Sequence, residues 1–196
     1  MPADVPASKR DELLEIASRL FYEQGFGATG IQQIIKEAGA AKGTFYAHFA
    51  SKEELGVAWL QQRDVASGKW LERFLDRHKT PGKKLLATFD FLLDWQKADG
   101  YRGCAFINTA SETPDFSSPM RKVVSKHKKA VRKLFETLAW EHFEERGFTK
   151  KEAKEKALTI YLLFEGALTE TEIEGAAWPS RAAKAGAASI LEAEKE

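Results

Sequence analysis

Several features of membrane-bound and exported proteins are missing from this sequence. Its 196 residues contain a single cysteine, Cys104, which excludes an intramolecular disulfide and a cysteine-rich zinc site. No apolar run approaches the ~20 residues that a membrane-spanning helix needs. Residues 1–8 do not combine a basic stretch with an apolar one, as a signal peptide does. We therefore expect a cytoplasmic protein without a membrane partner.

An excess of charge of one sign is also missing. The formal net charge is +1, and within residues 1–52 six basic residues are balanced by six acidic ones. Composition therefore does not reveal a basic domain, the usual electrostatic sign of a nucleic-acid-binding protein. DNA binding by this segment would depend on the placement of its charges, with the acidic groups turned away from the phosphates.

Helical periodicity covers almost the whole chain, whereas strand-like alternation, internal repeats, and motifs for a nucleotide, cofactor or metal do not occur. Glycine, proline and capping residues mark the breaks. Ser51 with Glu54, and Thr149 with Glu152, predict two capping boxes, and Thr29 is expected to cap another helix. We predict an all-α protein of about nine helices, over residues 8–24, 29–38, 41–49, 51–78, 81–98, 104–112, 120–146, 149–174 and 180–194.

Residues 29–49 have the pattern of a helix-turn-helix, in which a bracing helix and a tight turn present a second helix to the major groove. Isoleucines supply the brace, Gly39 supplies the turn, and Phe45 and Phe49 anchor the second helix on its inner side. Side chains suited to phosphates and base edges remain for its outer side and ends: Lys42, Thr44, Tyr46 and His48. Periodicity alone is equally compatible with a helical interaction protein that has a chance glycine turn.

The run from Gly39 to Leu55, GAAKGTFYAHFASKEEL, resembles the signature of TetR-type (tetracycline-repressor-like) transcriptional regulators. Further matches at the family's spacing extend the resemblance over roughly residues 9–60. It implies an all-helical homodimer with an N-terminal three-helix DNA-binding domain, a connecting fourth helix, and a C-terminal domain for effector binding and dimerisation. The corresponding division of this chain is 1–50, 51–78 and 79–196.

The resemblance also implies a set of contacts with a palindromic double-stranded DNA operator. Gln32, Thr44 and His48 occupy positions near bases. Four further residues match positions that are mainly near phosphates: Thr29, Lys42, Tyr46 and Lys52. Glutamine prefers the edge of adenine to that of guanine, and position 32 is often arginine in the family, so the operator sequence stays open. The implied activity is that of a regulator, most often a repressor, which a small-molecule effector releases from DNA.

Gly103 to Glu112, GCAFINTASE, looks like a segment of a subgroup of these regulators, some of which respond to reactive electrophiles. Two interpretations of Cys104 follow. As a small buried hydrophobic residue it needs no function, whereas as a sensor its thiolate would be favoured by the helix N-terminus and by Arg102. Catalysis by Cys104 with His127 or His142 is a further alternative, but no local pattern pairs them, and we expect no enzyme activity.

Large apolar residues in the C-terminal half can line an effector pocket, with a few polar groups to orient the ligand. The same residues could equally fill a core. The candidates are Phe89, Leu92, Trp95, Cys104, Phe106, Asn108, Trp140, Phe143, Tyr161, Phe164 and Glu165.

Two further patterns concern surfaces. Seven basic residues without an acidic one lie between Arg121 and Lys133. We interpret them as the solvated face of a helix, although an anionic effector or an additional DNA contact would also suit them. Small residues in the last helix permit close helix packing, and the resemblance implies a homodimer through the last two helices.

Overall fold

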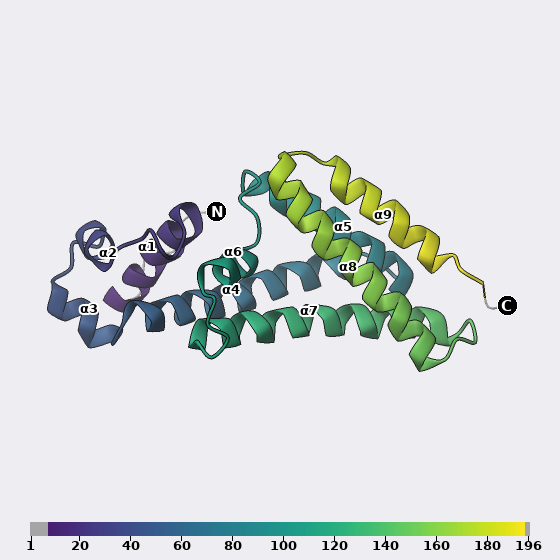
Figure 1. Cartoon of the computed structure of the whole chain (residues 1–196), viewed down its shortest axis with the longest axis horizontal. Helices are drawn as coiled ribbons and strands as arrows, with labels where there is room; N and C mark the ends of the chain where they lie inside the picture. Colours follow the sequence, from purple (N-terminus) through teal and green to yellow (C-terminus); the bar gives the residue numbers. More distant parts are fainter. Residues whose placement is uncertain (1–7, 195–196) are drawn as a thin grey trace. The chain divides into compact units, whose positions relative to one another are not determined.

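The computed structural model describes residues 8–194, and within this range the chain forms nine α-helices and no strand (Figure 1). The prediction of an all-α protein is therefore confirmed. None of these helices is long and apolar enough to cross a membrane.

The first four helices are α1 (Lys9–Gln24), α2 (Ile31–Glu37), α3 (Lys42–His48) and α4 (Lys52–Leu75). Gly25 ends α1 with a φ of 94°, a backbone conformation that glycine accepts without strain. At the start of α4, Ser51 Oγ accepts the N–H of Glu54 at 3.0 Å, as predicted. The Glu54 carboxylate accepts the N–H of Ala50 at 2.7 Å, one residue earlier than in the usual capping box.

The remaining helices are α5 (Pro81–Ala98), α6 (Ala105–Glu112), α7 (Pro119–Glu144), α8 (Lys150–Glu174) and α9 (Trp178–Leu191). Thr149 and Glu152 form the predicted capping box at the start of α8. Several helix boundaries differ from the expectation by two or three residues, for example the end of α4 at Leu75 and that of α9 at Leu191. Trp178 and Pro179 were expected in the break before α9, but they form its first turn. Proline fits there because the first helical N–H groups need no partner within the helix.

The chain divides into two compact units. Residues 8–65 and 105–126 form the first unit, and residues 66–104 and 127–194 form the second. These limits differ from the predicted divisions 1–50, 51–78 and 79–196. The main difference is that α6 and the first residues of α7 belong with the N-terminal helices.

Aromatic packing holds the first unit together. The ring of Phe21 in α1 lies 5.1 Å from that of Phe26 and 5.3 Å from that of Trp59 in α4. Ile34 and Phe45, from α2 and α3, are fully buried. Burial of this kind is the main favourable contribution to folding, and truncation of such a Phe or Trp to Ala typically costs about 3–5 kcal/mol.

The second unit is built on α5, α8 and α9, which lie side by side (Figure 1). Phe164 of α8 contacts Phe89 of α5 and Phe135 of α7, with ring centroids 5.8 Å and 5.3 Å away. Buried polar side chains complete the packing. Ser180 Oγ donates to the carbonyl of Phe89 at 2.8 Å, and Gln96 Nε2 donates to that of Leu168 at 3.1 Å.

Candidate DNA-binding surface

The turn between α2 and α3 is short and held by backbone hydrogen bonds. The N–H of Ala38 donates to the carbonyl of Ile34 at 2.9 Å, and that of Ala40 donates to the carbonyl of Ile35 at 3.0 Å. Gly39 has a φ of 55°, in the left-handed region that side chains other than glycine rarely enter. A methyl group there would meet no neighbouring atom, so the backbone conformation, and not space, requires the glycine.

α3 is anchored on one side only. Phe45 and Phe49 are buried, with their ring centroids 6.1 Å apart. The opposite side leaves Lys42, Tyr46 and His48 exposed and Thr44 half-buried. Tyr46 is 46% exposed, and the Lys42 ammonium lies 6.0 Å from the centre of its ring. On α2, Gln32 is exposed as well.

Thr29 does not have the place that the sequence suggested. It is fully buried, and its hydroxyl donates to the carbonyls of Gly25 at 2.8 Å and Leu20 at 3.2 Å. Gly30, not Thr29, is the N-cap residue of α2, and it provides no side-chain cap. The expected cap is therefore wrong, and the hydroxyl is unavailable to a phosphate because it already ties α1 to the start of α2.

Lys52 is half-buried and is held by the turn between α1 and α2. Its Nζ donates to the carbonyl of Gly27 at 3.3 Å and lies 4.4 Å from the centre of the Phe26 ring. Burial lowers the pKa of Lys52, and the attraction of Glu112 acts in the opposite direction. A phosphate contact by Lys52 therefore has to compete with partners inside the unit.

Two basic residues beside the helix-turn-helix were missed from the sequence. Lys9 Nζ donates to the carbonyl of Ala38 at 3.2 Å, and the guanidinium of Arg10 lies 5.0 Å from the centre of the Phe49 ring. Both residues belong to the first turn of α1, where the helix dipole disfavours cations. Lys9 offsets this position by an ion pair with Glu12, so Arg10 in the first helical turn is the clearer signal in the sequence.

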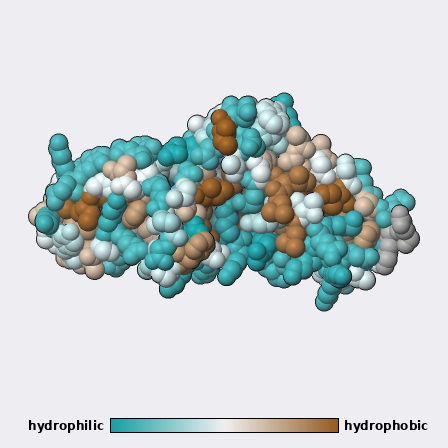
Figure 2. Space-filling view, viewed as in Figure 1, coloured by the Kyte–Doolittle hydropathy of each residue, from teal (hydrophilic) through white to brown (hydrophobic). Residues whose placement is uncertain are grey.

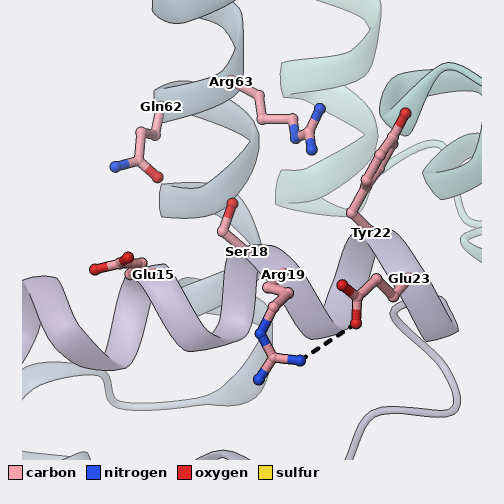
Figure 3. Close-up of a pocket in the computed structure, with 7 residues that line it drawn as sticks. All are labelled: Glu15, Ser18, Arg19, Tyr22, Glu23, Gln62 and Arg63. Atoms are coloured by element: carbon pink, nitrogen blue, oxygen red, sulfur yellow. Dashed lines mark hydrogen bonds and ion pairs between the residues drawn. The ribbon is translucent and has the colours of Figure 1, made fainter. Parts of the chain in front are cut away.

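Several acidic residues of the first unit gather around Arg19. Arg19 pairs with Glu23 at 3.2 Å and also with Glu37. The same side of α1 and α4 forms an open depression of about 330 Å³, where the Arg63 guanidinium lies 3.8 Å from the centre of the Tyr22 ring (Figure 3). The acidic groups that neutralise residues 1–52 are thus partly occupied away from the exposed side of α3.

Comparison with known proteins decides the family. The family model of bacterial regulatory proteins of the tetR family matches residues 13–58, and that of the LmrA/YxaF-like transcriptional regulator C-terminal domain matches residues 81–185. The chain belongs to the TetR family.

Two bacterial relatives and two crystal structures support the assignment over most of this TetR-family chain. The uncharacterized regulator YxaF of Bacillus subtilis is 32% identical over 167 residues, which cover 81% of this chain and 82% of YxaF. The repressor NemR of Escherichia coli is 28% identical over 167 residues, 84% of each chain. The structure of SCO4454 from Streptomyces coelicolor has a TM-score of 0.83 at 25% identity, covering 93% of this chain and 94% of that one. The reduced form of E. coli NemR has a TM-score of 0.79 at 27% identity, covering 93% and 97%.

The residues expected to line an effector pocket are divided between the two units of this TetR-family chain. Phe106 and Asn108 belong to the first unit, and the other candidates belong to the second. Trp95 packs against Phe91 and donates its indole N–H to Asp99 at 2.8 Å. Trp140 and Phe143 lie near the end of α7, where Lys150 lies over the Trp140 ring and Phe148 packs against Phe143. Leu92 is buried in α5.

Four of the candidates do meet in the second unit, together with a residue that was not proposed for the pocket. The rings of Tyr161 and Phe164 pack against the ring of Phe135. Phe89 packs against Phe164. Glu165, on the same helix, pairs with Lys128 at 2.6 Å. Lys128 was assigned to a solvated basic face, but it is half-buried by this ion pair.

Two polar features distinguish this meeting point from a filled apolar core. Burial raises the pKa of the Tyr161 phenol well above its usual range, and the charge of Glu165 and its hydrogen bond add to the shift. The second carboxylate oxygen of Glu165, Oε1, is buried without a hydrogen-bond partner among the described residues. A buried acceptor without a partner is costly, which makes this point attractive for a ligand with a donor group.

Proposed function

We propose that the chain is a transcriptional repressor that binds a palindromic DNA operator as a homodimer and releases it when a small-molecule effector binds. The membership of the TetR family supports transcriptional regulation, and the finer steps rest on the residues described above. One observation carries the proposal: α3 is buried on one side by Phe45 and Phe49 and leaves Lys42, Tyr46 and His48 exposed on the other. Exposed side chains of these types are suited to contacts with DNA phosphates and base edges.

In this proposal, Gln32, Thr44 and His48 read bases, and Lys42 and Tyr46 contact phosphates. Lys9 and Arg10 join the phosphate contacts because they lie beside the turn and the end of α3. Thr29 leaves the set because its hydroxyl is used internally. Lys52 remains a proposed phosphate contact, but its ammonium must give up the hydrogen bond to the Gly27 carbonyl to reach a phosphate.

The direct test is operator binding by a lysine variant at two salt concentrations. DNA selected from a random pool would be labelled, and its affinity for Lys42→Ala would be measured by fluorescence anisotropy. Loss of one phosphate contact should weaken binding on every sequence and reduce the slope of log K against log salt by about 0.9. Lys97→Ala, which removes an exposed lysine of α5, is the control. An unchanged slope for Lys42→Ala, or equal effects of both variants, would contradict the proposal.

Dimerisation is supported by an exposed apolar face on α8 and at the start of α9. Leu162 and Ile173, eleven residues apart and hence on the same side of α8, are 66% and 69% exposed, and Trp178 is 56% exposed. Figure 2 shows apolar side chains gathered over this part of the second unit. We propose that this face packs against its equivalent in a second copy around a two-fold axis.

The effector, in this proposal, binds in the second unit near Tyr161 and Glu165. Electrophile sensing by Cys104 is the alternative mode of release. Only 4% of Cys104 is exposed, which favours a structural role for the thiol. If Cys104→Ser is released from the operator by an electrophile as readily as the wild type, the alternative is excluded.

A further inference from the structure

Glu112, the last residue of α6, reaches the turn between α1 and α2. Its Oε2 accepts a hydrogen bond from the backbone N–H of Gly27, 85 positions earlier in the chain. Both residues belong to the first unit. The contact is made by an exposed side chain on an exposed turn, so burial of apolar surface does not account for it.

The other backbone group of Gly27 is held as well. Its carbonyl accepts the hydrogen bond from Lys52 at the start of α4. The peptide groups around Gly27 are therefore fixed from two sides, by a carboxylate of α6 and by an ammonium of α4. The attraction between Glu112 and Lys52 adds to this arrangement, since it favours the charged form of the lysine.

Two glycines of the turn, Gly25 and Gly27, leave room for the Glu112 carboxylate. A methyl group at Gly25 would lie 2.9 Å from Glu112 Oε1, and a methyl group at Gly27 would lie 3.1 Å from Oε2. Gly25 also needs to be glycine because its φ is 94°. Gly27 has no such backbone requirement, but a larger residue at this position would crowd the Glu112 carboxylate.

Neighbouring contacts tie the same segment to the N-terminal helices. A methyl group at Gly56 of α4 would lie 2.8 Å from Met120 Sδ, which shows how closely the start of α7 packs there. Ser118 Oγ donates to Glu53 of α4 at 2.9 Å. Glu112 thus acts from a segment that is itself fixed in the unit, which allows it to position the turn.

We propose that Glu112 is a positioning residue for DNA binding, which holds Gly27 and thereby fixes α2 and the helix-turn-helix on α1 and α4. Gly27 lies two residues before Thr29, whose buried hydroxyl joins α1 to the start of α2. Loss of the carboxylate frees the turn on one side, and α2, which braces α3, loses part of its orientation. The inference rests on the proposed function, because it concerns the geometry that an operator selects.

The test compares Glu112→Gln with Glu112→Ala in the full-length chain. Both variants lose the same negative charge, but only glutamine keeps an acceptor for the Gly27 N–H. We expect Glu112→Ala to weaken binding to the selected operator about fivefold, the effect of one net hydrogen bond, and Glu112→Gln to stay within about twofold of the wild type. Amide hydrogen exchange at Gly27 should be about fivefold faster in Glu112→Ala only. Equal behaviour of the two variants in both measurements would overturn the proposal.

A second variant tests the contact from the other side. Gly27→Ala crowds the carboxylate, so it should weaken operator binding in the wild-type background and have no further effect in Glu112→Ala. Additive effects would contradict the inference. If the wild type binds no selected DNA, the proposed function fails, and Gly27 exchange still decides whether Glu112 holds the turn. If the wild type binds and Glu112→Ala binds equally well, only the positioning role fails.

Discussion

At the scale of single residues, two threonines of the helix-turn-helix have opposite environments. Thr29 is buried with its hydroxyl bonded to two carbonyls, whereas Thr44 is half-buried on the outer side of α3. Both match contact positions of the family, and the sequence predicts that Thr44 lies near bases and Thr29 near phosphates. The structure separates them because the Thr29 hydroxyl donates to two backbone carbonyls, whereas the Thr44 hydroxyl makes no hydrogen bond within the described residues 8–194.

We therefore predict different effects of the same substitution. Thr29→Val removes the donor but keeps the shape, so two buried carbonyls each lose a partner, and the free energy of unfolding should fall by about 1–3 kcal/mol. Thr44→Val should change stability by less than about 0.5 kcal/mol, as is usual for surface substitutions, while it weakens operator binding. Urea denaturation and anisotropy measure the two quantities. A reversed pattern would show that the assignment of the two residues is wrong.

Tyr161 gives a prediction about pH. Its pKa is raised by burial and by Glu165, so the folded state keeps the phenol proton at a pH where the unfolded chain, with a pKa near 10, has lost it. The contribution of the phenol to the free energy of unfolding is therefore fully present below about pH 10 and decreases as the pH rises above that value. Thermal denaturation of Tyr161→Phe should therefore show a shallower alkaline decline than the wild type. Tyr46→Phe, which alters an exposed phenol, serves as the control, and parallel curves for Tyr161→Phe and wild type would contradict the prediction.

At the scale of helices, the ends are the features that local sequence determines best. The capping box of α8 involves Thr149 and Glu152, three residues apart, and needs no distant partner. The same holds for Ser51 at the start of α4. Such ends could be predicted because their chemistry is contained in four consecutive residues.

Other features of the helices could not be predicted, because they depend on contacts between distant positions. Glu112 and Gly27 are far apart in sequence, and so are Lys128 and Glu165. Periodicity indicated that Phe89 and Phe164 face inward, but it could not show that Trp95 and Phe143 pack elsewhere. The composition of a helix face reveals burial, whereas its neighbours follow only from the tertiary arrangement.

The capping box allows a quantitative prediction at this scale. Thr149→Ala removes the acceptor for the N–H of Glu152, and it should lower the free energy of unfolding by about 1 kcal/mol. Thr159→Ala is the matched control, since its hydroxyl donates to the carbonyl of Glu155 within the same helix and caps nothing. Denaturant midpoints compare the two variants. A larger loss for Thr159→Ala would exclude a capping contribution at Thr149.

At the scale of the whole molecule, assembly is expected to depend on the exposed apolar face of the second unit. A double substitution, Leu162→Glu with Ile173→Glu, places four like charges in a two-fold interface and should convert the dimer to a monomer in sedimentation experiments. Operator affinity should fall with it, because a monomer occupies only one half-site. Val65→Glu, at a residue that is 58% exposed on α4, is the control. A dimer that survives the double substitution would place the interface elsewhere.

The composition of the first unit has a consequence for protein engineering. Two stretches, residues 8–65 and 105–126, build it together, and the second provides Glu112 and Met120. A chimera that joins this N-terminus to a relative's C-terminal half at residue 50 or 65 would inherit foreign partners for Gly27 and Gly56. Exchange of DNA specificity between relatives should therefore succeed more often when residues 105–126 are transferred together with the helix-turn-helix and the rest of residues 8–65.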